Sequence, residues 1–174
     1  MKTREVTVAS GETFVVPQGV QRLDSKTTKG WQVRYQGTKY FADGQAGASS
    51  ALASATKELL RRIATLPAPV VLKKAPSPRK SSTLPPGISG PILVTRRRSE
   101  PEAVISVLIP RYGSRNTIRK IRIGTRSSYT QARYEAAVSK AIAMRTDCLA
   151  KYVAAAAKAK RSEAKAFKKA STTA

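Results

Sequence analysis

The sequence predicts an α+β protein with two small modules, each a three-stranded antiparallel sheet backed by one helix. Short runs of alternating apolar and polar residues occur in two clusters, and a helical pattern follows each cluster. A basic stretch that holds most of the ten prolines separates the clusters and has no acidic residue, which is typical of an extended linker. The same order of elements in both clusters indicates internal duplication.

Five segments follow from this pattern. Residues 1–16 predict an N-terminal hairpin or arm, and residues 17–65 the first sheet-plus-helix module. Residues 66–86 predict the basic, proline-rich linker. Residues 87–153 predict the second module with an extended helix, and residues 154–174 a basic tail rich in alanine and lysine.

In the first module, residues 31–35 alternate strictly and predict the central strand. Because successive side chains of a strand point to opposite faces, Trp31, Val33 and Tyr35 share one face and Gln32 and Arg34 share the other. Over residues 49–63, apolar residues recur at spacings of three and four, which predicts a helix with one apolar face. We expect this helix to cover the Trp31 face.

The second module has three β-like runs before its helix, and the last of them carries cations. Over residues 118–125, Ile121 and Ile123 are expected to face the core, which leaves Lys120 and Arg122 facing outward. The middle run is nearly all apolar, which makes it a poor candidate for the strand that reads bases through polar side chains.

The second helix is predicted from about residue 129 to residue 145 and continues into the tail. Beyond residue 153 the large apolar residues disappear and alanine, lysine and arginine dominate. These residues favour helix, but the tail offers no evident face to bury. We therefore expect a fraying helix or a disordered tail that contacts phosphates non-specifically.

The composition limits the classes of function that the chain can have. The 174 residues include 33 Lys/Arg and 10 Asp/Glu, a formal charge of +23 that attracts polyanions. There is no histidine, and the single cysteine, Cys148, excludes an internal disulfide and a cysteine-rich zinc site. The carboxylates are scattered, so we expect neither catalysis nor a cofactor or metal. The sequence has no apolar run of membrane-spanning length, so we expect a cytoplasmic protein with no membrane partner. With its positive charge, we expect it to be nucleoid-associated in a bacterial cell or phage-infected host.

The arrangement resembles the Apetala/ethylene-response-factor and integrase-arm type of DNA-binding domain. The matching pieces are Gly87-Ile88-Ser89-Gly90, the runs over residues 103–111 and 118–125, and the helix over residues 130–143. The first module is similar through residues 19–22, residues 30–35 and its helix. The resemblance implies a three-stranded sheet whose exposed face enters the major groove while the helix backs it. The apolar middle strand departs from the family pattern, which has arginines and a tryptophan there.

Cationic and amide side chains on the strands, turns and linker are the candidate nucleic-acid contacts, because they suit guanine edges and phosphates. They are Gln32, Arg34, Lys39, Arg79, Lys80, Arg96, Arg97, Arg98, Arg111, Arg115, Arg119, Lys120, Arg122 and Arg126. The linker tetrapeptide Ser77-Pro78-Arg79-Lys80 is also similar to the Ser-Pro-basic-basic tetrapeptides of chromatin proteins, which sit in A/T-rich minor grooves.

Three functions remain open on these grounds. The first is a non-enzymatic protein that binds duplex DNA and regulates transcription or organises DNA. The second is an RNA-associated or virion-internal structural protein whose basic arms thread a polyanion. The third is an adaptor that binds an acidic host protein through the first module.

Overall fold

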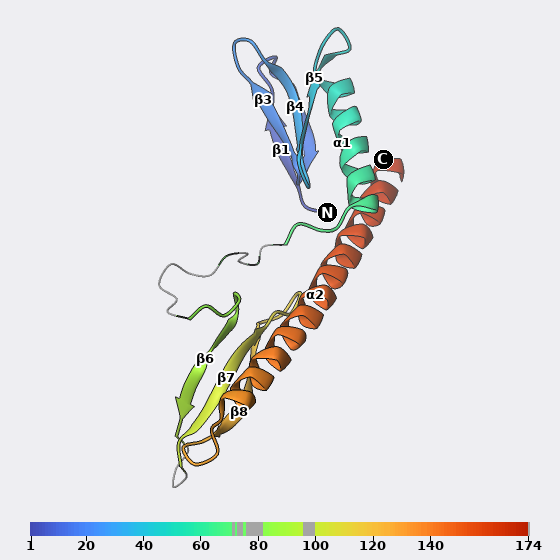
Figure 1. Ribbon diagram of the computed structural model, residues 1–174. Helices are drawn as coiled ribbons and strands as arrows, with labels where there is room; N and C mark the ends of the chain where they lie inside the picture. Colours follow the sequence, from blue (N-terminus) through green and yellow to red (C-terminus); the bar gives the residue numbers. More distant parts are fainter. Residues whose placement is uncertain (71, 73–74, 76–81, 96–99, 174) are drawn as a thin grey trace. The chain divides into compact units, whose positions relative to one another are not determined.

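The protein has an α+β fold with three antiparallel sheets and two helices, as the sequence predicts at this level (Figure 1). The computed structural model describes residues 1–70, 72, 75, 82–95 and 100–173. Residues 71, 73–74 and 76–81 of the predicted linker lie outside the described residues. The elements are β1 (Thr3–Thr7), β2 (Thr13–Pro17), β3 (Val20–Asp24), β4 (Lys29–Arg34), β5 (Thr38–Ala42), α1 (Gly47–Thr65), β6 (Ile88–Val94), β7 (Glu102–Ile109), β8 (Thr117–Thr125) and α2 (Gln131–Thr173).

The chain forms two compact units. The first comprises Met1–Val70 together with Ala156–Ala174, and the second comprises Val71–Ala155. The first unit contains the hairpin β1-β2, the sheet β3-β4-β5 and α1, and the second contains the sheet β6-β7-β8. Residues of α2 belong to both units.

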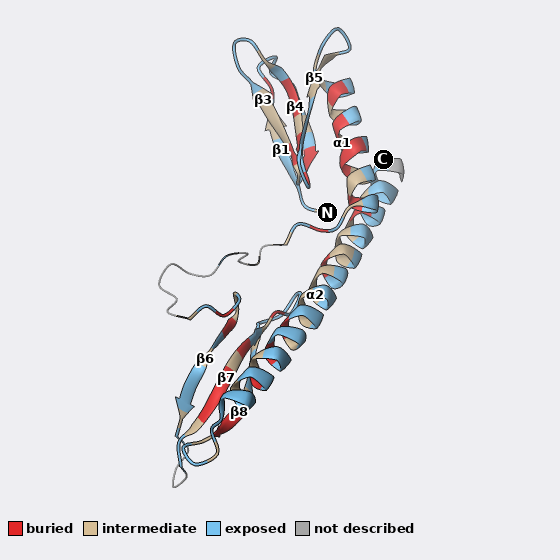
Figure 2. Cartoon of the chain, in the orientation of Figure 1, coloured by how far each residue is buried: buried red, intermediate tan, exposed pale blue. Residues whose placement is uncertain are grey.

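The core of the first unit forms around the central strand β4. Trp31 and Val33 are fully buried in one cluster with Leu59 of α1, which confirms the predicted inward face of this strand. Figure 2 shows buried residues on both β4 and α1. The Trp31 indole Nε1 donates a hydrogen bond to the carbonyl of Ala48 at 2.8 Å, so the ring's polar atom is satisfied in the core. From the hairpin, Phe14 meets Trp31 edge to face, with 5.9 Å between ring centroids.

The core of the second unit forms around β7. Ile105 and Val107 are fully buried and belong to one cluster with Ile88, and Ala137 and Ala141 of α2 complete that cluster. Each fully buried aliphatic side chain of this size stabilises the fold by about 1.5–3 kcal/mol. The apolar middle run therefore serves as the central strand of the core.

The prediction that the chain beyond residue 153 has no face to bury is wrong. Helix α2 begins at Gln131, where the Thr130 hydroxyl accepts a hydrogen bond from the Arg133 backbone N–H at 3.2 Å, and it runs to Thr173. Beyond residue 153, Ala156 and Ala164 are buried, and Ala164 belongs to the core of the first unit. An alanine methyl group also removes apolar surface from water when it is buried, so a packed face does not require large apolar residues.

Candidate nucleic-acid interface

Each three-stranded sheet has a second face, turned away from its core, and the strand register assigns side chains to it. Residues paired across neighbouring antiparallel strands lie on the same face. In the second unit, Lys120 pairs with Ser106 and Arg122 pairs with Val104. Because Ile105 and Val107 face the core, these four residues lie on the opposite face, which we call the open face of β6-β7-β8.

Lys120 and Arg122 are exposed on this open face. Ile123 is buried and Ile121 packs against the same core, which confirms the predicted division of β8. Glu102 lies 3.5 Å from the Arg122 guanidinium, and both side chains have solvent access. Such an exposed ion pair is weak, so Arg122 can exchange Glu102 for a stronger anion.

Apolar side chains share the open face with these cations. Ile118 is 62% exposed, and its cross-strand neighbour Leu108 is also exposed. Ile92 on β6 pairs with Val104 and is exposed as well. The open face therefore combines two cations with a partly exposed apolar surface, and the apolar middle strand contributes Leu108 to it.

In the first unit, Gln32 and Arg34 lie on the face of β4 away from Trp31, as predicted. The Arg34 Nε donates a hydrogen bond to the Gln32 Oε1 at 2.6 Å, which joins the two side chains. Across the strands, Gln21 and Tyr40 pair with Gln32 and share its face. Tyr40 is partly exposed, and its hydroxyl donates to the carbonyl of Lys29 at 2.7 Å.

Next to Arg34 the hairpin forms a basic hollow of about 370 Å³. Its lining consists of Lys2, Thr3, Arg4, Gln18, Gly19, Val20, Gln21 and Arg34. Three of these residues are cations and none is acidic. The Arg4 Nη2 donates to the carbonyl of Val20 at 3.2 Å, which holds Arg4 against β3. Three cations and no carboxylate in one lining favour an anion such as a phosphate group.

Lys2 and Arg4 are interface candidates that the sequence did not identify. Arg4 lies in β1 and Lys2 directly precedes that strand. The sequence predicts a hairpin here, but not that the hairpin lies beside Arg34. The spacing of two residues between Lys2 and Arg4 indicated a shared face, but it gave no location for the surface they join.

Two other candidates lie on the opposite side of their sheets. Lys39 pairs with Val33, and its Nζ lies 5.3 Å from the Phe41 ring centroid, so it is separated from Arg34 by the sheet. Arg119 is exposed but pairs with Val107, so it faces away from Lys120. The structure therefore does not bring Lys39 or Arg119 to the faces described above.

The remaining described candidates lie near the two ends of β8. Arg111 and Arg115 line a hollow of about 560 Å³ at the β7–β8 turn, together with Tyr152 of α2. Arg126 is exposed in the turn that follows β8. These arginines extend the positive charge beyond the open face at both ends. The candidates outside the described residues are Arg79, Lys80, Arg96, Arg97 and Arg98.

One cation of the second unit is buried and serves its core. Arg145 of α2 donates from Nη1 to the carbonyl of Leu108, and its guanidinium lies against Gly87. Burial lowers the pKa of Arg145. The Arg145 Nε is buried without a hydrogen-bond partner. Arg145 thus tethers α2 to the end of β7 and contributes little to the surface charge.

The acidic residue with the strongest contacts is Glu58 of α1. Its carboxylate accepts hydrogen bonds from Arg61 at 2.8 and 2.9 Å and from Arg62 at 2.8 Å, and these bonds lower its pKa to about 2. Within the described ranges no group of three or more acidic or cysteine residues is placed to hold a metal ion. No helix in the described part of the chain combines the length and apolar character needed to cross a bilayer.

Comparison with protein-family models, curated proteins and solved structures yields no match to this chain. The resemblance to the Apetala/ethylene-response-factor and integrase-arm type of domain therefore remains an inference from the sequence. The function must be argued from the surfaces themselves.

Proposed function

We propose that this chain is a non-enzymatic protein that binds duplex DNA, as a regulator of transcription or an organiser of DNA. The observation that carries the proposal is the pair Lys120 and Arg122 on a sheet face turned away from the core, in a chain of net charge +23. A polyanion gains affinity from releasing counterions, and exposed cations on a firm scaffold supply this term.

The geometry of the open face suits the major groove. A short β-sheet or ribbon fits this groove, where arginine and lysine contact guanine and apolar side chains contact the thymine methyl group. Lys120 and Arg122 supply the polar contacts, and Ile118 and Leu108 supply the apolar ones. The arginines at both ends of β8 lie where they can contact flanking phosphates.

The two three-stranded sheets then act as two modules of one plan. Arg34 and the basic hollow give the first module an anion-binding surface of its own. The basic, proline-rich segment over residues 66–86 links the two modules, and binding of both to one duplex would raise affinity through effective concentration. Lysines near the end of α2 add salt-sensitive phosphate contacts.

Fluorescence anisotropy with a labelled duplex of about 20 base pairs tests the proposal, because each neutralised phosphate contributes to the salt slope. We expect affinity to fall linearly with salt on logarithmic axes, and duplex DNA to compete better than structured RNA of equal length. Selection of bound sequences from a random DNA pool then establishes whether one site is preferred. Equal competition by both nucleic acids would contradict a duplex-specific function.

A second candidate is recognition of unpaired bases, as in an RNA-associated protein. Tyr40 favours it, because an exposed aromatic ring on the same sheet face as Gln32 and Arg34 can stack on a base. Replacing Tyr40 with alanine should weaken binding to single-stranded RNA by roughly 1–3 kcal/mol if it stacks on one base. An unchanged affinity for single strands would remove this candidate.

A further inference from the structure

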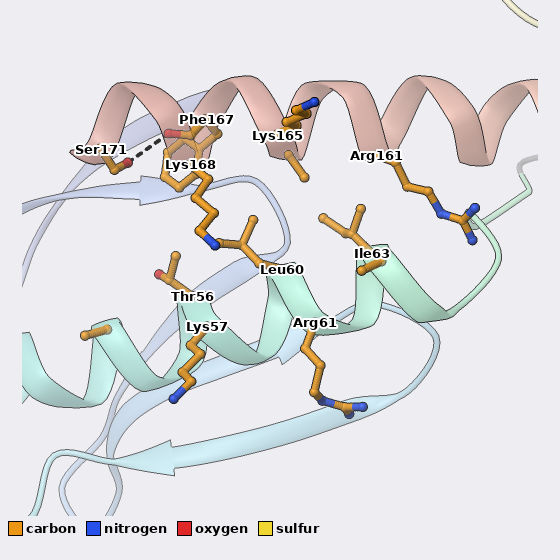
Figure 3. Close-up of a pocket in the computed structure, with 13 residues that line it drawn as sticks. Thr56, Lys57, Leu60, Arg61, Ile63, Arg161, Lys165, Phe167, Lys168 and Ser171 are labelled. Carbon is orange, nitrogen blue, oxygen red and sulfur yellow. Dashed lines mark hydrogen bonds between the residues drawn. The ribbon is translucent and has the colours of Figure 1, made fainter. Parts of the chain in front are cut away.

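The first unit contains a groove between α1 and the last third of α2, and the proposed DNA interface does not use the apolar residues that line it. It has a volume of about 850 Å³, and both of its walls are helical (Figure 3). Figure 3 shows Leu60 and Ile63 of α1 pointing toward α2, where Phe167 lies near the far end. Ala164 lines the groove between these ends, and the floor is therefore apolar.

Cations surround this apolar floor. Lys57 of α1 and Arg161 and Lys165 of α2 line the groove and are exposed. No residue that lines it within the described part of the chain is acidic. The nearby Glu58 is already bound by Arg61 and Arg62, so it does not neutralise the remaining cations.

We propose that this groove binds an acidic amphipathic helix of a partner protein. An amphipathic helix places residues at spacings of three and four into an apolar groove between helices. The apolar floor matches such a stripe, and the small side chains of Ala53, Ala64 and Ala164 permit close approach of a helix. Carboxylates on the flanks of the partner helix would meet Lys57, Arg161 and Lys165.

Other occupants match less well. A nucleic-acid backbone gains nothing from an apolar floor, whereas an amphipathic helix uses both floor and rim. A second copy of this chain has 33 basic against 10 acidic residues, so its charge opposes the rim. The chain's own linker over residues 66–86 has no acidic residue to offer. This inference does not depend on the proposed DNA binding.

The test uses two fluorescein-labelled peptides of about 18 residues, long enough for five helical turns. Both contain the same leucines and glutamates; in one the leucines form a single stripe, and in the other they are spread around the helix. Anisotropy with the full chain at about 0.15 M salt should show at least tenfold tighter binding of the striped peptide. Equal binding of both peptides would reduce the effect to surface charge and overturn the proposal.

Single substitutions test whether the striped peptide binds in this groove. Leu60→Asp places a carboxylate in the floor and should weaken the striped peptide about tenfold or more while leaving duplex DNA binding unchanged. Phe167→Ser, at the half-buried end of the groove, provides a second floor variant if Leu60→Asp alters the circular dichroism spectrum. Lys57→Glu should weaken the binding of both peptides. Lys26→Glu is the matched control, because it makes an equal charge change in an exposed loop of the same unit and should weaken peptide binding much less.

Two results would assign the groove to another ligand and overturn the proposal. One is displacement of the striped peptide by duplex DNA together with loss of DNA affinity in Leu60→Asp. The other is binding of anionic lipid vesicles that depends on Leu60 and exceeds the binding of the striped peptide.

Discussion

Neutralising the two cations of the open face gives the sharpest test of DNA binding. Lys120→Gln with Arg122→Gln removes two positive charges and keeps side chains of similar length on the exposed surface of β8. Counterion release gives a slope of about −0.9 per phosphate contact in duplex DNA, so the double variant should lower the slope's magnitude by about 1.8. At roughly 0.15 M salt each contact of this kind contributes about 1 kcal/mol, and the loss of both corresponds to an affinity about thirtyfold lower.

The ion pair between Arg122 and Glu102 adds a test of opposite sign. Because Glu102 competes with phosphate for the Arg122 guanidinium, Glu102→Gln should raise DNA affinity. This gain should be smaller than the loss of affinity caused by Arg122→Gln. Fluorescence anisotropy titrations at four or more salt concentrations measure both the affinity and its slope.

Lys151→Gln is the matched control for this experiment. Lys151 is an exposed cation of the same unit, but it lies on α2 and pairs with Asp147 at 2.7 Å. We expect its neutralisation to change the slope little. If Lys151→Gln lowers affinity and slope as much as Arg122→Gln, the charge of the whole chain carries the binding. In that case the open face is not the interface.

Three further predictions concern the stability of the two units. Glu58→Gln should make unfolding less sensitive to acid. Hydrogen bonds from Arg61 and Arg62 hold the pKa of wild-type Glu58 at about 2, below its ordinary value of 4.5. The ionised carboxylate therefore stabilises the fold above pH 4.5 and loses this effect as pH falls toward 2, so the thermal midpoints of variant and wild type should converge there. Gly30→Ala should destabilise the first unit by about 1–3 kcal/mol in urea unfolding, since its new Cβ would lie 2.6 Å from the Tyr40 hydroxyl. Gly87→Ala should lower the free energy of unfolding of the second unit by about 1–3 kcal/mol or more, because Gly87 has a φ of +81° and a Cβ there meets the Arg145 guanidinium. An unchanged urea midpoint in either glycine variant would contradict the packing described for that glycine.

Local alternation predicted which face each strand presents, because a strand's side-chain period is fixed by its backbone. Trp31 and Val33 against Arg34, and Ile123 against Arg122, follow directly from this period. The α+β class followed as well, since helical and strand periodicities separate clearly in this chain. Such inferences need no knowledge of the partner strand.

The surfaces that depend on distant pairing could not be predicted in this way. Arg4 meets Arg34 only because the hairpin folds back beside β3, and no local pattern gives that register. Alternation places Lys39 and Tyr40 on opposite faces of β5, but only the pairing of Lys39 with Val33 shows that Lys39 lies on the core side of the sheet. Arg145 resembles any surface cation of an alanine-rich helix, and its burial depends on the space left by Gly87.

The contribution of the end of α2 to the first core was hidden for a different reason. A helix made of alanine and lysine has no stripe of large apolar residues, so its periodicity gives little indication of a packed side. Ala164 is nevertheless buried, because the core accepts a small residue in close contact. Hydrophobic periodicity thus underestimates packing wherever alanine forms the contact.

The discontinuous first unit has a consequence for synthesis of the chain. Ala164 belongs to its core, yet the whole second unit is translated between Val70 and Ala156. Domains usually fold in the order in which they leave the ribosome, but here the amino-terminal unit is the one that is completed last. We therefore expect the second unit to mature first, and a chain stopped at Ala155 to expose apolar surface on α1.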